Sequence, residues 1–257
     1  MYLFSILNKK NGFNIMNAFI PTPNQITQEK EFQLSKLFLN EITHSVGHDL
    51  RSPLFVIRSY AQLLKLNKDK QRLDRGLEMI NEATTNMEGI INGLVQLIDF
   101  YTCPIPTFER IDFQQIFNQV RLQLCNEIME HKPKFKIDFT DCPTIIFSSS
   151  YLKEIMTNLI DNAMRHNANK QDLVITIKTV KRGNQFQLNV IDNGKGVPNP
   201  KELAALKTPF YSNTDSQDRP GVGLSKIQAI AQRVNGSFKI VSPLGIEMTA
   251  CKFIFPT

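Results

Sequence analysis

The sequence predicts an α+β protein in which a helical hairpin is followed by a two-layer α/β sandwich. In the first part of the chain, apolar residues recur at steps of three and four, which is the period of an amphipathic helix. Beyond Pro104 and Pro106, short apolar strands alternate with helical segments, and this mixture predicts a sheet covered by helices. A hydrophobic content of 42% in 257 residues is sufficient for a buried core.

The hairpin is expected over residues 34–101, after a loosely ordered leader at 1–33 and with a polar break at 67–72. The second helix carries a heptad row, formed by Leu73, Leu77, Ile80, Thr84, Met87, Ile91, Leu94, Ile98 and Tyr101. One hairpin cannot cover both of its own apolar stripes, so the sequence predicts a homodimer whose four helices form a bundle.

Residues 102–107 are expected to form a linker, because their two prolines cannot continue a helix. The sandwich is expected over 108–257. Its predicted strands are 108–112, 135–139, 173–180, 186–191, 237–241 and 248–255. Its predicted helices are 113–130, 150–166 and 224–234.

Composition excludes several classes of protein. No apolar run approaches the ~20 residues that span a bilayer, and no signal-peptide pattern opens the chain, so we expect a cytoplasmic protein without a membrane-spanning segment. Four scattered cysteines argue against a disulfide framework or a zinc site. An anionic nucleotide explains the formal charge of +6 as well as nucleic acid does, and we predict no nucleic-acid partner.

The first chemical motif is HDLRSPL, residues 48–54, within the first helix. A neutral imidazole offers a lone pair near pH 7, so His48 is a candidate nucleophile for phosphorylation. Asp49 can orient this imidazole or take its proton. A lone helical histidine is usually a surface or core residue, and His48 differs from that case only through its neighbours.

The second motif is NLIDNAMRH, residues 158–166, on a predicted helix. Asn158 and Asn162 are four residues apart and therefore face the same way. Their amide oxygens can bind magnesium beside phosphates, while Arg165 can neutralise phosphate charge. A pair of solvent-facing asparagines is an equally good reading of this motif alone.

The third motif, IDNGKGV, follows directly after an apolar strand. Asp192 can accept a hydrogen bond from an exocyclic amine such as that of adenine. Gly194 and Gly196 allow the backbone to approach a ring closely. Taken alone, this motif is weak support for a site, because Asp-Gly turns are common.

The fourth motif is the polar segment 208–224, which ends in Gly221 and Gly223 at the start of a helix. Free backbone amides and the helix dipole favour phosphate at such a position. The segment is typical of a lid over a triphosphate, although a lone Gly-x-Gly is found in many unrelated proteins.

In their order and spacing, HDLRSPL, NLIDNAMRH, DNGKGV, TPFY and GVGL resemble the motifs of two-component sensor histidine kinases over residues 34–257. The resemblance implies a dimerisation and phosphotransfer hairpin, followed by an ATP-binding catalytic domain of the Bergerat (GHKL) fold. It also implies ATP and magnesium as cofactors. The implied partner is the receiver domain of a response regulator, whose aspartate accepts the phosphoryl group.

The resemblance implies roles for single residues. His48 is similar to the phospho-acceptor, Asp49 to its acidic neighbour, and Asn162 to the magnesium ligand. The candidate nucleotide-binding residues are Asn158, Asn162, Arg165, Asp192, Gly194, Gly196, Phe210, Gly221, Gly223 and Leu224.

The chain departs from the family pattern at three places. Arg219 stands where a glycine is frequent, and Ser52 where a threonine or asparagine commonly supports dephosphorylation of the partner. Ser149 and Ser150 stand near the place where an aspartate often precedes the nucleotide-site helix. Two other functions stay open. A GHKL ATPase of the chaperone or repair type would leave HDLRSPL unexplained. Arg219 leaves open a catalytically silent dimeric nucleotide-binding scaffold.

Overall fold

The computed structural model describes most of the chain from residue 46 onward. The described residues are 46–47, 49–65, 70–167, 170–183, 185–197, 199, 203, 206, 221–243 and 246–255. The predicted leader, His48, Phe210 and Arg219 lie outside them. The helices with defined bounds are α2 (Lys70–Thr102), α3 (Phe113–Gln123), α4 (Cys125–His131), α5 (Ser149–Arg165) and α7 (Gly223–Arg233). The strands are β1 (Glu109–Asp112), β2 (Lys134–Asp138), β3 (Thr144–Phe147), β4 (Val174–Arg182), β5 (Gln185–Asp192), β6 (Ser237–Val241) and β7 (Thr249–Ile254).

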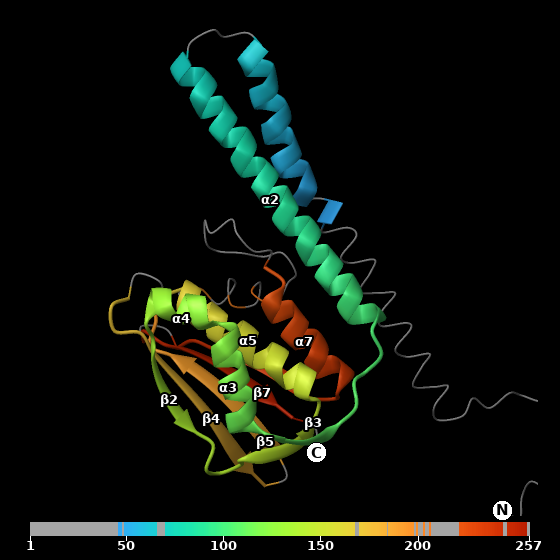
Figure 1. Cartoon of the computed structure of the whole chain (residues 1–257), viewed down its shortest axis with the longest axis vertical. Coiled ribbons are helices and arrows are strands. Elements are labelled where there is room, and N and C mark those ends of the chain that lie inside the picture. The colour runs from blue at the N-terminus through green and yellow to red at the C-terminus, as the bar shows by residue number, and fades with distance from the viewer. Residues whose placement is uncertain are drawn as a thin grey trace, which may run out of the picture. The chain divides into compact units, whose positions relative to one another are not determined.

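A helix over residues 49–65 lies beside α2 and forms the predicted hairpin with it (Figure 1). The buried side of α2 carries Gly76, Ala83 and Leu97, which are separated by multiples of seven residues. A Cβ added at Gly76 would lie 2.7 Å from Cδ2 of Leu64, so the glycine allows the two helices to approach closely. The intramolecular contact therefore uses a stripe of α2 that includes small residues.

The predicted heptad row forms a second stripe on α2, and much of it faces outward. Leu73, Leu77, Ile91 and Ile98 have exposed fractions of 40%, 52%, 46% and 38%. Exposed apolar residues that form a continuous row mark an interaction surface, whereas isolated ones do not. We therefore expect a second copy of the chain to cover this stripe, as the heptad pattern predicts.

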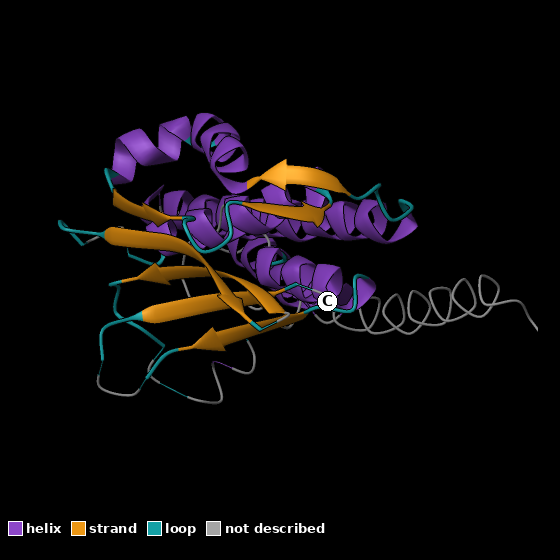
Figure 2. Ribbon diagram, turned by 90° about the horizontal axis from the view of Figure 1, so that it is seen from below, coloured by secondary structure: helices purple, strands orange, loops and turns teal. Residues whose placement is uncertain are grey.

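A five-stranded sheet with the order β2-β4-β5-β7-β6 forms one layer of the sandwich. β2 and β4 are parallel, and the other neighbouring strands are antiparallel. Helices cover one face of this sheet (Figure 2), and buried residues of α3, α5 and α7 form a common core with those of the strands. The predicted α+β class is confirmed. Among the described helices, none has the length and apolar character needed to cross a membrane.

Two features of the sandwich differ from the predictions. The expected helix 113–130 is two helices, α3 and α4, which meet at the buried Leu124 (φ −97°, ψ 22°). The strand β3 was not predicted; it has only four residues, pairs with β1 and completes a separate two-stranded sheet. Its outward residue Ile146 is apolar, so apolar and polar residues do not alternate along the strand and no period can be recognised. The other predicted elements of the sandwich agree with the structure within two residues.

The start of α5 is fixed by a side-chain cap. Ser148 Oγ accepts a hydrogen bond from the backbone N–H of Tyr151 at 3.2 Å, which satisfies one of the free amides of the first turn. Ser148 is itself only 1% exposed. The cap fixes the residue at which α5 begins. Together with the length of the helix, it determines which residues lie at the other end of α5.

The outward stripe of α2 leads to a prediction about the oligomer. Replacing Ile91 by Glu places a charge where an apolar contact between copies is expected, and the dimer should weaken by at least about tenfold, the equivalent of about 1.4 kcal/mol. Sedimentation equilibrium over a range of concentrations measures the change. Gln96→Glu, an equally large charge change on another side of α2, should leave the dimer intact. A monomeric wild-type chain, or a dimer that tolerates Ile91→Glu, would contradict the expectation.

Candidate functional site

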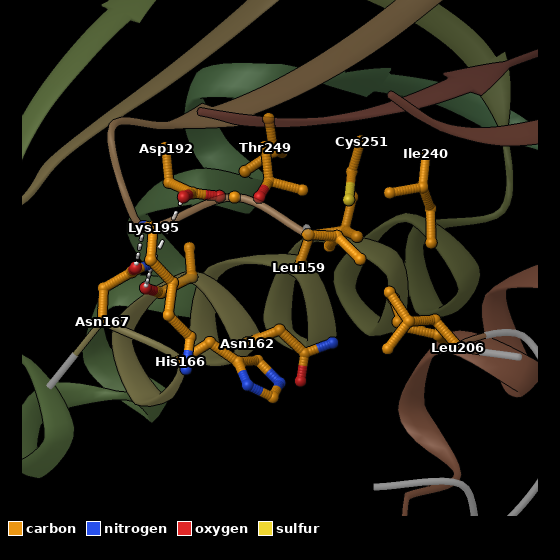
Figure 3. Close-up of a pocket in the computed structure, with 15 residues that line it drawn as sticks. Leu159, Asn162, His166, Asn167, Asp192, Lys195, Leu206, Ile240, Thr249 and Cys251 are labelled. Carbon is orange, nitrogen blue, oxygen red and sulfur yellow. Dashed lines mark hydrogen bonds between the residues drawn. The ribbon is translucent and has the colours of Figure 1, made fainter. Parts of the chain in front are cut away.

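A cavity of about 420 Å³ lies between α5 and the strands β5, β6 and β7 (Figure 3). Its apolar lining comes mainly from Leu159, Val190, Leu206, Leu224, Ile240 and Cys251. Its polar lining comes mainly from Asn162, His166, Asn167, Asp192, Lys195 and Thr249. In Figure 3, Asn167, Asp192 and Lys195 gather on one side, while Leu206 and Ile240 lie on the other. A cavity of this kind accepts a flat apolar ring that carries polar groups at one edge.

Asp192 is the buried acidic group of the cavity. It is the last residue of β5, is 8% exposed, and lies opposite Thr249 in the β5–β7 register. Its Oδ1 accepts hydrogen bonds from the backbone N–H of Gly194 at 2.9 Å and from Nδ2 of Asn167 at 3.2 Å. Oδ2 receives no hydrogen bond from another described residue, so this oxygen is left to accept from a ligand.

Burial raises the pKa of the Asp192 carboxyl, because the low-dielectric surroundings disfavour its charged form. The hydrogen bonds from Gly194 and Asn167 act in the opposite direction, as does the charge of Lys170. These donors favour the carboxylate and hold it in one orientation. The carboxylate form is the one that can accept from an amine with either oxygen.

The turn after β5 requires glycine at one position for backbone reasons. Gly196 has φ +71°, and a Cβ there would lie 2.9 Å from Oγ of Ser242 and 3.2 Å from the carbonyl oxygen of Ile246. A non-glycine residue would be strained by both the left-handed conformation and the crowding. Ser242 Oγ also accepts from the backbone N–H of Val197 at 2.7 Å, which ties the turn to the loop after β6.

The predicted residues of α5 occupy different surroundings. Asn162 is half-buried and lines the cavity. Arg165 does not line it; its Nη2 donates to Asp161 Oδ2 at 2.6 Å and to Asn162 Oδ1 at 3.4 Å. Asn158 also lies away from the cavity, with its Nδ2 donating to the backbone oxygen of Glu154 at 2.8 Å.

The start of α7 lies against α5. A Cβ at Gly223 would lie 2.5 Å from Oδ1 of Asn158, so any side chain at this position would require the Asn158 side chain to move. Leu224 lines the cavity, whereas Gly221 and Gly223 do not. Gly194 does not line it either, but its N–H holds Asp192.

The hairpin candidates can be placed only in part. Asp49 is helical and half-buried, whereas the predicted phospho-acceptor His48 lies outside the described residues, as does the predicted nucleotide-binding residue Phe210. Among the described residues, no group of three or more His, Cys, Asp or Glu side chains can hold a metal ion.

Sequence reasoning did not assign four polar residues that line the cavity: His166, Asn167, Lys195 and Thr249. His166 and Asn167 directly follow α5, where the predicted motif ends, and Lys195 lies inside the predicted glycine turn. Position within a motif or directly beside one was the only available signal for these three residues. No sequence signal identified Thr249, because it lies beside Asp192 only through the register of β5 and β7.

His166 is a titratable group in the cavity wall. Burial lowers its pKa below the ordinary 6.5, and the positive charges of Arg165 and Lys195 lower it further, while Asp161 acts in the opposite direction. The folded chain therefore holds His166 neutral near pH 7.

This depressed pKa predicts a dependence of stability on pH. Below about pH 6.5 the unfolded chain binds a proton at His166 more readily than the folded chain, so the stability that His166 contributes is present above this pH and is lost as the pH falls. His166→Gln should flatten the fall in the free energy of unfolding between pH 6.5 and 5, measured by urea denaturation. The two proteins compared at pH 8 provide the control, and an unchanged slope would count against the buried neutral imidazole.

Comparisons with known proteins match both parts of the chain. The family model described as His Kinase A (phospho-acceptor) domain matches residues 38–98. The model described as Histidine kinase-, DNA gyrase B-, and HSP90-like ATPase matches residues 148–256, which contain every described residue that lines the cavity.

Individual relatives agree with these matches. Drug sensory protein A of Synechocystis sp. is 24% identical over 249 residues, covering 91% of this chain and 37% of that protein. The phosphate regulon sensor protein PhoR of Haemophilus influenzae is 27% identical over 226 residues, covering 82% of this chain and 50% of that protein. This chain thus spans about half the length of these relatives, or less.

A solved structure shows the same fold at low sequence identity. The histidine kinase ThkA, crystallised with the response regulator protein TrrA, aligns with a TM-score of 0.65 and 16% identity, covering 90% of this chain and 66% of that one. A phospho-acceptor domain and a histidine kinase-type ATP-binding domain thus follow each other along one chain, and the protein belongs to the two-component sensor histidine kinases.

Proposed function

We propose that this chain is an ATP-dependent protein histidine kinase that phosphorylates its own His48 and passes the phosphoryl group to an aspartate of a receiver domain. One observation carries the proposal. A cavity with a buried carboxylate at one edge and apolar walls lies in the same chain as a phospho-acceptor domain match that includes residue 48. The division into a hairpin at 34–101, a linker at 102–107 and a catalytic domain at 108–257 belongs to this proposal.

The cavity suits the adenine ring. Leu159 and Val190 supply apolar contact for its faces, while Asp192 Oδ2 accepts from its exocyclic amine. A base with a carbonyl at this position would bring an acceptor against an acceptor. The buried carboxylate would therefore select adenine over guanine.

The phosphates would extend along α5 toward Asn162 and the start of α7. Backbone amides at the first turn of α7 have no partner within the helix and suit phosphate oxygens. Asn162 offers an amide oxygen, which fits magnesium because this ion is usually held by one or two protein oxygens together with substrate phosphates. Bound magnesium supplies charge neutralisation for the transferred group. Arg165, bonded to Asn162, adds a fixed positive charge nearby.

In the transfer itself, an imidazole nitrogen of His48 attacks the γ-phosphorus of ATP. The bond between this phosphorus and the β,γ-bridging oxygen breaks, ADP leaves, and a phosphorus–nitrogen bond forms. Asp49 takes or orients the proton on the other ring nitrogen. In the second step the phosphorus–nitrogen bond breaks as an aspartate oxygen of the receiver attacks.

The partners follow from the same arrangement. The outward stripe of α2 provides a surface for a second copy of the chain, and the ThkA structure shows that a kinase of this fold binds a response regulator. We expect the receiver to dock on the hairpin near His48, where the phosphoryl group is presented.

Labelling with γ-³²P-ATP tests the transfer. The purified chain should acquire label that is stable in alkali and lost in acid, as phosphohistidine is, and His48→Gln should abolish it without weakening nucleotide binding. His44→Gln, four residues earlier in the sequence, should keep the label. Label that persists in His48→Gln, or a wild-type chain that binds ATP and acquires none, would overturn the proposal and favour the silent scaffold.

Asp192→Asn tests the base-reading role. The change puts an N–H₂ group where an acceptor is needed, and one mismatched buried hydrogen bond costs about 1–3 kcal/mol, so ADP should bind roughly five- to a hundredfold more weakly. Isothermal titration calorimetry measures the affinity. Asp138→Asn, an exposed acid on β2, is the matched control and should bind as the wild type does. Equal affinities for all three proteins would exclude Asp192 as the adenine reader.

A further inference from the structure

Asn167 lies between the end of α5 and the turn that follows β5, and its side chain is fully engaged there. Its Nδ2 donates to the backbone oxygen of Ala163 at 2.8 Å and to Asp192 Oδ1 at 3.2 Å. Its Oδ1 accepts from the backbone N–H of Lys195 at 3.0 Å. The residue is 9% exposed. One carboxamide thus connects α5 with both ends of the segment from Asp192 to Lys195 (Figure 3).

Only a carboxamide of this length can make all three bonds. Asparagine offers two N–H donors and one acceptor oxygen, and here both donors and the oxygen are used. An aspartate has the same shape but no donor, and it would place a second carboxylate against Asp192. An aliphatic side chain would leave the Lys195 N–H without its partner. Asparagine is therefore the residue type that can hold the turn through all three hydrogen bonds.

The same side chain explains the glycine at position 194. The three atoms nearest to a Cβ built at Gly194 are the Oδ1, Cγ and Nδ2 of Asn167, and all three would overlap with it. The backbone itself does not demand glycine, because among the described glycines only Gly183 and Gly196 have positive φ. The obstacle to a side chain at 194 is thus the Asn167 carboxamide.

From these contacts we infer that Asn167 is the positioning residue of the adenine-reading carboxylate, and that residue 194 is glycine because Asn167 occupies the space of its side chain. This inference rests on the proposed function. Asn167 acts through Asp192: its Nδ2 directs Oδ1 toward α5, and Oδ2 is left for the ligand. By holding Lys195 N–H as well, it fixes the turn in the conformation that brings Gly194 N–H to Asp192.

If Asn167 positions Asp192, replacing Asn167 should change how nucleotide binding depends on pH. The hydrogen bond from Asn167 is one of the interactions that lower the pKa of Asp192 against the effect of burial. Without it this pKa rises, so the loss of nucleotide binding at acid pH should begin at a higher pH. The charged and titratable groups around Asp192 are Lys170, Lys195 and His166, and they are unchanged in the variants below.

The variant Asn167→Leu removes the hydrogen bonds while approximately keeping the side-chain volume. It adds no charge beside Asp192 but removes both donors and the acceptor for Lys195 N–H, so ADP should bind about tenfold more weakly at pH 7.5. The acid limb of a plot of affinity against pH, measured by calorimetry between pH 5 and 8, should move to higher pH. A residue that merely filled space would leave this limb where it is in the wild type. Thermal unfolding of each variant shows whether it is folded.

A double-mutant cycle with Gly194 tests the steric part. Gly194→Ala should weaken ADP binding by about tenfold or more in the wild-type chain, because the new methyl group displaces the Asn167 side chain. In the background of Asn167→Ala, where the obstructing atoms are absent, the same change should cost less than about threefold. If Gly194→Ala is equally harmful in both backgrounds, the glycine serves some other contact, such as the approach of the ligand.

The outcomes distinguish this inference from the proposed function. A wild-type chain that binds neither ATP nor ADP would overturn the proposed function itself. A wild-type chain that binds ADP, together with an Asn167→Leu variant of unchanged affinity and unchanged acid limb, would overturn the role of Asn167 alone.

Discussion

The packing of α5 against the sheet is the constraint on which the rest of the site depends. Leu152, Ile155, Met156 and Met164 are all completely buried, and each side chain of this size contributes about 1.5–3 kcal/mol relative to exposure. A close-packed interface of this kind does not permit the helix to slide or rotate, since any shift would open voids along its length. The direction of Asn162, on the cavity side of the same helix, is therefore set by the core.

The other walls of the cavity are built where secondary structure ends. Asp192 is the last residue of β5 and Thr249 the first of β7, and the antiparallel register places them opposite each other. Backbone groups beyond the end of an element lack a regular partner, so side chains and ligands can bond them. Asn167 uses this property for the turn after β5, and a nucleotide phosphate would use it at the start of α7. The free polar groups at these ends therefore surround one cavity, in positions that the rigid core fixes.

Much of this could be predicted from the sequence where the signal is local. Helical and strand periods predicted most elements of the sandwich, and Asp192, Asn162, Gly196 and Leu224, all named from motifs, lie around the cavity. The hydrogen bonds of Asn167 could not be predicted, because they join residues 25 and 28 positions apart. Only the packing of α5 on the sheet brings those residues together. The short strand β3 was missed for a related reason: its partner β1, rather than its own pattern, makes it a strand.

Helix α7 contacts α5 at one end and the end of α2 at the other. Its first residue, Gly223, lies against Asn158 of the nucleotide motif, while its last, Arg233, donates to the carbonyl oxygens of Phe100 and Cys103 at 2.8 Å each. These contacts tie the catalytic domain to the end of α2. Each such hydrogen bond contributes about 0.5–1.5 kcal/mol, or up to about 3 when one partner is charged. Because Arg233 is charged, the two bonds together contribute about 3–6 kcal/mol. The end of α2 is thus fixed by the last residue of the same helix whose first residue packs against Asn158, so a shift of α7 would be felt at both places.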